Sequence, residues 1–143
     1  MPVIPEQYLD ILHSTALAYI ATLGPKGEPR VSPVWFGWDG TQLFFSMTKG
    51  RQKYRNLLRE PRVAVAIADP TNPYRSLELR GVARIDDDPT HRFANVLSQK
   101  YLHRDTTPEE SPLDEERVVI IVEPKDVVVF PFQAEKNSQR VSP

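Results

Sequence analysis

Short connections between strand-like segments constrain this fold more than any other feature of the chain. Apolar or alternating residues occupy segments 17–23, 30–38, 41–47, 62–68, 76–85, 117–123 and 126–132. Most of the gaps are too short for the crossovers of a dozen or more residues that parallel neighbours need. The sequence therefore predicts a mainly β (α+β) fold of about seven strands, an antiparallel sheet closed into a barrel.

About three short helices are expected outside this barrel. The first begins at Pro5 and runs to about His13, because proline suits the first position of a helix. The second covers residues 50–58, where Pro61 prevents continuation and the inward side chains are expected to be Tyr54, Leu57 and Leu58. Asp88-Pro89 has the order of an N-cap and first helical residue, and it precedes an apolar face of Phe93, Val96, Leu97 and Tyr101.

Turn residues and alternation locate two strands more closely. Pro33 interrupts segment 30–38, which predicts an edge strand, a bulge or an opening in the ladder. Asp39-Gly40 between apolar runs predicts a hairpin. In the strand that follows, alternation places Leu43, Phe45 and Met47 on one face and Phe44, Ser46 and Thr48 on the other.

Composition excludes several classes of protein. The 143 residues suit one domain, here residues 1–132, followed by a polar tail at 133–143. There is no cysteine, and the three histidines are too scattered for a metal site. A net charge of −1 argues against nucleic-acid binding. Since no apolar run approaches a membrane span and no signal peptide is evident, we expect a cytoplasmic protein without membrane contact.

A basic segment stands at the end of the strand at residues 41–47. Two hydroxyl residues, Ser46 and Thr48, lead into a turn and a helix start that carry Arg51, Lys53 and Arg55. Backbone N–H groups at a helix start favour an anion, Arg can hold a phosphate with two hydrogen bonds, and Lys adds a compact charge. The segment predicts a site for a phosphate-bearing cofactor or ligand. A solvated helix face paired with Glu60 or other acids is the alternative.

Four ordered features resemble a known family. They are the helix, strand and Gly-Pro-Lys-Gly-Glu-Pro turn leading to 30–36, the segment 45–57, the step Glu60-Pro61-Arg62-Val63-Ala64, and the Gly-containing strand 79–83. Together they resemble the split-barrel, flavin-reductase-like fold of the pyridoxamine-phosphate-oxidase class over roughly residues 6–130, also called the FMN-binding split barrel. Within that class the chain most resembles the short subgroup that uses the deazaflavin coenzyme F-420.

The resemblance implies a homodimer with two cofactor sites at its interface. By position, the phosphate would lie on Arg51 and Lys53 with Ser46 and Thr48 nearby, the ring would lie along residues 32–35, and the partner would contribute residues near 74–79. The implied cofactor-binding residues are Ser32, Pro33, Val34, Trp35, Ser46, Met47, Thr48, Arg51, Lys53, Tyr74 and Leu77. The oxidase proper has an Arg and a His near its C-terminus, but here no histidine follows His103. This departure argues against pyridoxamine phosphate oxidation and weakens a haem-degrading function.

Several of these residues also have a purely structural interpretation. Ser46 and Thr48 could be ordinary strand polarity, and residues 32–35 could be an edge strand bearing a buried Trp. Aromatic residues at 35–45 are expected to pack in the core or a dimer interface, and Glu78, Arg80 and Arg84 to form an ion-pair ladder. The three histidines, His13, His91 and His103, are expected at the surface or in helix caps.

We therefore expect a reductase that passes a hydride from reduced coenzyme F-420 to a small organic acceptor. No acid–base pair is evident, which suits chemistry carried by a cofactor. Catalytic residues remain unassigned, with Tyr54 and Tyr74 as candidate proton donors. The alternatives are an FMN-dependent oxidoreductase of the same fold and a carrier that binds a flavin or deazaflavin without turnover.

Overall fold

The computed structural model describes residues 4–131 as one seven-stranded sheet in the order β2-β1-β5-β6-β7-β4-β3, in which every pair of neighbours is antiparallel. The strands are β1 (Ala18–Leu23), β2 (Pro29–Val34), β3 (Gly37–Trp38), β4 (Leu43–Thr48), β5 (Arg62–Asp69), β6 (Asn72–Asp87) and β7 (Arg117–Phe130). The helices are the 3-10 turn η1 (Glu6–Tyr8), α1 (Leu9–Leu12), α2 (Gln52–Arg59) and α3 (Arg92–Leu102).

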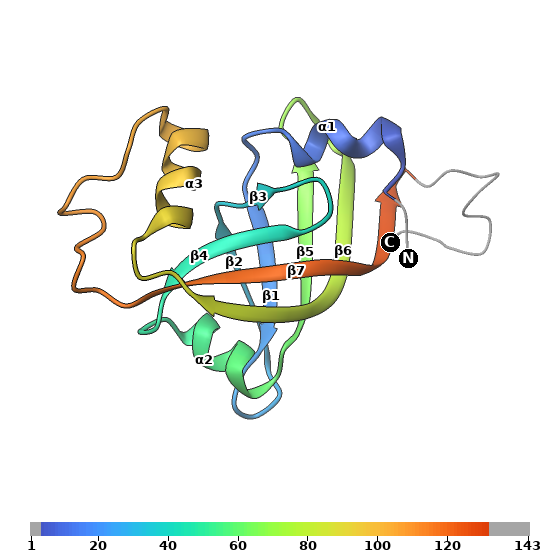
Figure 1. Cartoon of the computed structure of the whole chain (residues 1–143). Helices are drawn as coiled ribbons and strands as arrows, with labels where there is room; N and C mark the ends of the chain where they lie inside the picture. The colour runs from blue at the N-terminus through green and yellow to red at the C-terminus, as the bar shows by residue number, and fades with distance from the viewer. Residues whose placement is uncertain (1–3, 132–143) are drawn as a thin grey trace.

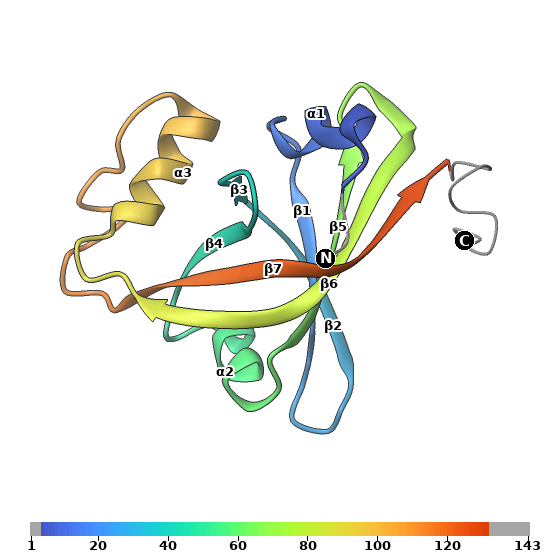
Figure 2. The same cartoon turned by 45° about the vertical axis from the view of Figure 1, so that its right-hand side comes forward.

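Two long strands curl the sheet into a split barrel. β6 and β7 bend along their length, so that β4 lies across from the layer formed by β1 and β5 (Figures 1 and 2). Helix α1 covers one end of β5, α2 lies at the opposite end beside β1, and α3 lies beside β4 (Figure 1). The predicted fold class is confirmed.

The core fills the space between these layers. Alternate residues of each strand point inward, so Leu43, Phe45 and Met47 of β4 are buried as predicted. They pack in one cluster with Ile20 of β1 and Leu79 of β6. The other face of β4 carries the half-buried residues Phe44, Ser46 and Thr48.

A bulge replaces the predicted break between the last two strands. The segments at 117–123 and 126–132 form one strand, β7, through Phe130. Arg80 pairs with Asp126 and Gly81 with Pro124, so Lys125 is the extra residue. A Cβ at Gly81 would lie 2.5 Å from the Glu123 carbonyl oxygen. This close approach explains the glycine in an otherwise regular strand.

Other predicted boundaries also need correction. Segment 30–38 forms two strands, β2 and β3, separated by two residues. Pro33 lies on β2, an edge of the sheet, as one of its three interpretations required. Helix α3 begins at Arg92 rather than after Asp88, but the Asp88 carboxylate still accepts hydrogen bonds from the backbone N–H groups of Arg92 and Phe93.

Two side chains predicted to face inward are exposed. Leu58 of α2 points to solvent, and the polar Asn56 takes the buried position beside Leu57. Val96 of α3 is also exposed. The predicted tail at 133–143 and the end of the last predicted strand, residue 132, lie outside the described residues. Among residues 4–131, no helix has the length and apolar character needed to cross a membrane.

Candidate functional site

A cavity of about 720 Å³ opens between the end of β4, the start of α2, the link after β2, and α3 with the loop that follows it. This volume is typical of small-molecule and cofactor sites. The lining residues are Leu17, Pro33, Val34, Trp35, Ser46, Met47, Thr48, Gly50, Arg51, Lys53, Leu97, Glu110, Glu115 and Arg117. Eight of the eleven residues expected to bind a cofactor are therefore brought together on one cavity.

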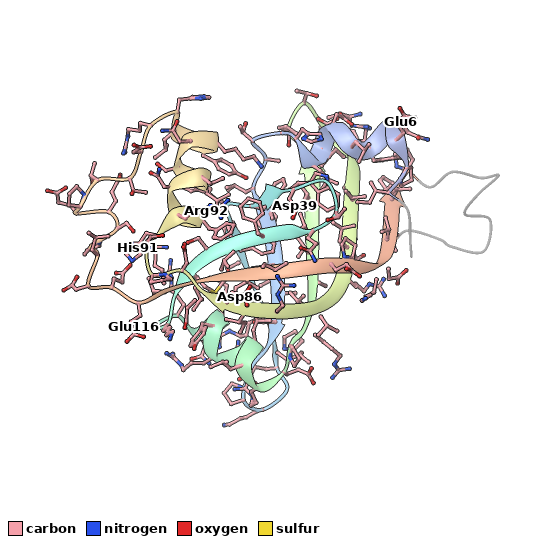
Figure 3. All side chains as sticks on the ribbon, in the orientation of Figure 1. Glu6, Asp39, Asp86, His91, Arg92 and Glu116 are labelled. Carbon is pink, nitrogen blue, oxygen red and sulfur yellow. The ribbon has the colours of Figure 1, made fainter. Side chains whose placement is uncertain are left out.

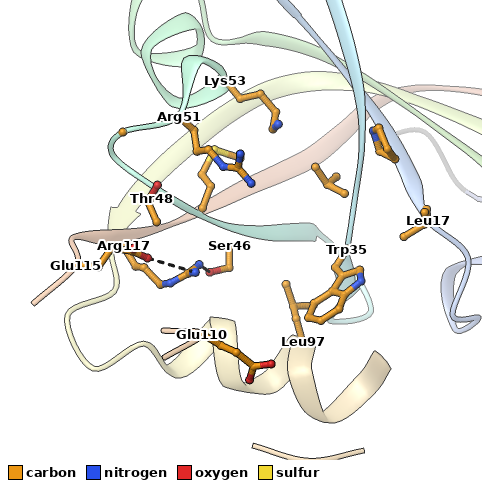
Figure 4. A pocket seen from close by; sticks show the side chains of 14 residues that line it. Leu17, Trp35, Ser46, Thr48, Arg51, Lys53, Leu97, Glu110, Glu115 and Arg117 are labelled. Carbon is orange, nitrogen blue, oxygen red and sulfur yellow. Dashed lines mark hydrogen bonds and ion pairs between the residues drawn. The ribbon is translucent and has the colours of Figure 1, made fainter. Parts of the chain in front are cut away.

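Two cationic side chains form one end of the cavity. The side chains of Arg51 and Lys53 enter it from the α2 side (Figure 4). Neither makes a hydrogen bond or ion pair with any other described residue, whereas Arg55 donates to the Gly50 carbonyl and the Gln52 side chain. Burial, and then the neighbouring Arg51 charge, lower the pKa of Lys53. Two like charges that pair with no acidic side chain of residues 4–131 make this end of the cavity favourable for an anion.

Local structure explains why these cations face the cavity. β4 ends at Thr48, and Arg51 takes the N-cap position of α2 in an extended conformation, without using its side chain as a cap. The helix is held on β1 because Asn56 donates a buried hydrogen bond of 3.0 Å to the Thr22 hydroxyl. Asn56 in turn accepts one from Gln52. These bonds set the rotation of α2, and with it the direction of residues 51 and 53.

The floor of the cavity, next to Arg51 and Lys53, is polar. Ser46 and Thr48 share the half-buried face of β4 that the alternation predicted. Arg117, which pairs with Thr48 across the sheet, donates from Nη1 to the Ser46 hydroxyl at 3.1 Å. Its Nη2 lies 3.5 Å from a Glu115 carboxylate oxygen, and a dashed line in Figure 4 marks this ion pair. The Arg117 Nε is buried without a hydrogen-bond partner among residues 4–131.

Sequence reasoning missed Arg117 because its relevance depends on tertiary pairing. Residue 117 only begins a strand in the sequence, and nothing local indicates that it pairs with Thr48, which lies 69 residues upstream. The polar, acidic and proline-bearing segment 104–116, a loop by its composition, was the one sequence signal beside it. That loop brings Glu110 and Glu115 to the cavity wall opposite α2.

The acidic wall is already neutralised in part. Glu110 receives two hydrogen bonds from the Arg104 guanidinium, at 2.8 and 2.7 Å. This pairing, with a hydrogen bond from the Thr107 backbone, lowers the pKa of Glu110 to about 2. The carboxylate is therefore ionised near neutral pH, and its charge is balanced away from Arg51 and Lys53.

An apolar wall completes the cavity. Pro33, Val34 and Trp35 come from the edge strand and the link after it, and Leu17 and Leu97 lie nearby. The Trp35 ring stacks on Tyr101 of α3, with centroids 5.0 Å apart and planes 6° apart. The remaining aromatic residues mostly pack inward: Phe36 and Phe45 are fully buried, and Phe44 meets Phe93 edge-on.

Three expected site residues lie apart from the cavity. Ser32 lines a separate recess of about 200 Å³, which it shares with Arg30, Arg51 and Lys53. Tyr74 is exposed near the β5–β6 hairpin and does not line the cavity. Leu77 is 1% exposed in the core, and its strand pairs on both sides. Because neither its side chain nor its backbone is free, Leu77 drops out of the candidate site.

The histidines do not form a reactive group. His91 is buried at the N-cap position of α3, and His13 and His103 follow α1 and α3 at their C-caps, so the expected cap positions are confirmed; Figure 3 shows His91 where α3 begins. Its Nε2 donates to the Glu115 carbonyl at 2.9 Å, and its Nδ1 lies 2.6 Å from the Ser111 hydroxyl, so it holds the loop. Within residues 4–131 there is no cluster of acidic residues and histidines that could bind a metal.

Comparison with known proteins agrees with this architecture. The family model described as pyridoxamine 5'-phosphate oxidase matches residues 4–129. Among solved structures, one named F420 reductase is 40% identical, with a TM-score of 0.80, and the match covers 87% of this chain and 98% of that one. A conserved hypothetical protein of Mycobacterium tuberculosis is 26% identical, with a TM-score of 0.74 and coverage of 90% and 85%.

A more distant structure supports the fold alone. General stress protein 26 of Bacillus anthracis is 19% identical, with a TM-score of 0.68 and coverage of 90% and 94%. The family match spans nearly all of the described residues, including both ends of the cavity. The chain therefore belongs to the pyridoxamine 5'-phosphate oxidase family.

Proposed function

We propose that this chain is an oxidoreductase that binds coenzyme F-420 and uses it to reduce a small organic acceptor. One observation carries the proposal: Arg51 and Lys53, unpaired among the described residues, stand at one end of a 720 Å³ cavity whose other wall is apolar and aromatic. A flavin-like cofactor has this distribution of properties, with a phosphate at the end of a chain that begins at a flat ring.

The chain's own residues would bind and orient this cofactor. Arg51 and Lys53 would hold the phosphate, Ser46 and Thr48 offer hydroxyl groups beside them, and the Pro33–Trp35 segment would lie along the ring. When bound, the deazaflavin supplies the hydride, so the protein needs to provide position and electrostatics more than acid–base groups. Any proton for the product would come from solvent or from Tyr54 or Tyr74.

Similarity favours coenzyme F-420 over FMN. The structure named F420 reductase shares 40% identity over almost its whole length. An FMN-dependent oxidoreductase is the second candidate, because FMN also presents a ring, a ribityl chain and a phosphate. A carrier that binds either cofactor without turnover is the third.

A homodimer with the cofactor at its interface is part of the proposal. On the outer side of the sheet, Tyr19, Val31 and Val82 are exposed. They flank a mostly apolar groove of about 330 Å³ that includes Ala21, Ala64 and Gly81, with Arg62 and Arg80 also in its lining. An apolar face of this kind favours association with a second copy. In such a dimer the exposed Tyr74 of one protomer would reach the cofactor of its partner.

The test is titration of the purified protein with coenzyme F-420 and with FMN, followed by quenching of ligand fluorescence. Hydrogen bonds to charged groups contribute about 1.5–3 kcal/mol, so Arg51→Ala and Lys53→Ala should each weaken binding about tenfold or more. Arg55→Ala is the matched control, since it removes the same charge from the same helix and its side chain is bonded elsewhere. It should change affinity less than about threefold.

Turnover separates the remaining candidates. Reduced coenzyme that is bound and then oxidised by members of a panel of organic acceptors supports the reductase. Bound reduced coenzyme that no acceptor oxidises would leave the carrier. Saturable binding of FMN but not of coenzyme F-420 would favour the FMN-dependent enzyme. Binding of neither cofactor would refute the proposal.

A further inference from the structure

The link between β2 and β3 has no strand partner of its own. β2 ends at Val34 and β3 begins at Gly37, so Trp35 and Phe36 lie outside the sheet pairing. Backbone outside a ladder is free to adopt several conformations unless other groups hold it. Trp35 nevertheless forms a wall of the cavity, where a fixed orientation matters most.

Helix α3 supplies the missing constraint through Tyr101. The Tyr101 hydroxyl donates to the Ala16 carbonyl at 2.7 Å and accepts a hydrogen bond from the Phe36 N–H at 3.2 Å. Its ring stacks in parallel on Trp35. A single side chain therefore holds both the backbone of the link and the indole ring that lines the cavity.

Lys100 holds the same link from the neighbouring position. Its Nζ donates to the Phe36 carbonyl at 2.7 Å and lies 3.7 Å from the centroid of the Phe36 ring. It makes no ion pair within residues 4–131. Burial without a counter-ion lowers the pKa of Lys100 to about 8. The ammonium group therefore loses hydration where it contacts Phe36. Both polar groups of the Phe36 backbone thus bond to α3.

We propose that Tyr101 and Lys100 are positioning residues that hold Trp35 as the wall against which the flat ring of the cofactor lies. This inference rests on the proposed function, because it names the part of the site that recognises the ring. It assigns α3 a role in affinity and ring orientation beyond its packing on β4. The alternative is that the two residues only stabilise the fold.

Fluorescence of Trp35 tests whether Tyr101 and Lys100 hold its side chain in place. The chain has two tryptophans, so Trp38→Phe leaves Trp35 as the single indole. In that background Tyr101→Phe keeps the stacked ring and removes the hydroxyl hydrogen bonds to Ala16 and Phe36. Tyr101→Leu removes the stack as well, and Lys100→Met removes the Nζ hydrogen bond. The fluorescence anisotropy of Trp35 should fall in all three variants, most in Tyr101→Leu, without any ligand present.

Ligand binding tests whether Trp35, held in this way, is the wall for the ring of the cofactor. Immobilising one side chain on binding costs an amount equivalent to about a two- to tenfold change in affinity. Each variant should therefore bind coenzyme F-420 about two- to tenfold more weakly. The inhibition constant of inorganic phosphate against that binding should keep its wild-type value. A purely structural role would not separate the ring from the phosphate in this way. Lys125→Met, at a surface lysine paired with Glu123, is the matched control and should change neither quantity.

The outcomes separate the two proposals. Variants that keep wild-type anisotropy, or that lose anisotropy but bind the coenzyme as the wild type does, overturn the positioning role and leave the proposed function intact. A parallel loss of coenzyme and phosphate binding would also overturn it, since it indicates general damage to the site. A wild-type protein that binds neither cofactor refutes the proposed function and the role of Trp35 with it.

Discussion

Single residues of the same kind have different surroundings in this molecule. Arg51 and Arg55 are four positions apart at one helix start. Arg51 points into the cavity and its side chain has no partner among residues 4–131, whereas Arg55 donates hydrogen bonds to Gly50 and Gln52. The sequence predicted the cluster of cations at a strand end, because hydroxyl residues and a helix start are local features. Local patterns alone did not rank the cations, although the family resemblance singled out Arg51 and Lys53. Arg117 was missed, because its place in the site depends on contacts between distant residues.

Lys100 leads to a prediction about pH. Its pKa is about 8 in the folded protein and near 10.5 when the chain is unfolded. Between these values the unfolded state binds more protons, so Lys100 makes stability rise with pH over this window. The free energy of unfolding of the wild type relative to Lys100→Met should therefore increase between pH 7.5 and pH 10, measured by urea unfolding. A difference that stays constant or falls would contradict the burial of an uncompensated ammonium.

At the scale of elements, the start of α3 depends on a capping residue that lies outside the helix. Asp88 is buried and accepts two backbone hydrogen bonds, at 3.0 and 2.9 Å. Asp88→Ala should lower the free energy of unfolding by about 1 kcal/mol, within a range of about 0.5–2 kcal/mol. The neighbouring Asp87→Ala is the control, because Asp87 is exposed and, within the described range 4–131, its carboxylate pairs only with Lys49. Equal losses in the two variants, measured by urea denaturation, would show that Asp88 is not the cap.

The attachment of α2 to β1 can be tested by a double-mutant cycle. Thr22 and Asn56 are both buried and share one hydrogen bond. Thr22→Val should destabilise by about 1–3 kcal/mol, because it leaves the Asn56 amide unpaired. The loss of unfolding free energy in the double variant Thr22→Val/Asn56→Leu should be smaller than the sum of the losses in the two single variants. Strictly additive losses in thermal or urea unfolding would mean that this bond does not set the position of α2.

Sequence patterns predicted most elements and missed how some of them join. The Asp39-Gly40 hairpin is confirmed, and the Asp39 carboxylate accepts hydrogen bonds from the N–H groups of Thr41 and Gln42. The segment around Pro124 was predicted to separate two strands, because proline interrupts the alternation. However, β6 pairs with β7 on both sides of the bulge, so β7 is one continuous strand. In α2, Leu58 was expected inside by periodicity, but Asn56 is buried there because Thr22 offers it a partner. Such exchanges depend on tertiary contacts.

At the scale of the whole molecule, the proposed dimer makes a prediction about mass in solution. Sedimentation should give twice the mass of one chain. Val82→Arg should shift the protein toward the monomer, because it puts a charge on the exposed apolar face beside the groove. Val96→Arg makes the same change on the exposed face of α3 and should leave the dimer intact. A wild-type protein that sediments as a monomer and still binds the cofactor would contradict a cofactor site shared between two protomers.

The central claim is that the cations at positions 51 and 53 meet the phosphate of a flavin-like molecule. Calorimetric titration with FMN and with riboflavin, which lacks the phosphate, tests it most directly, for the wild type, the Arg51→Ala/Lys53→Ala variant and the Arg55→Ala control. We predict that wild type and control bind FMN about tenfold or more tightly than riboflavin, and that the double variant binds the two ligands alike. Equal preference for FMN in all three proteins would contradict the account.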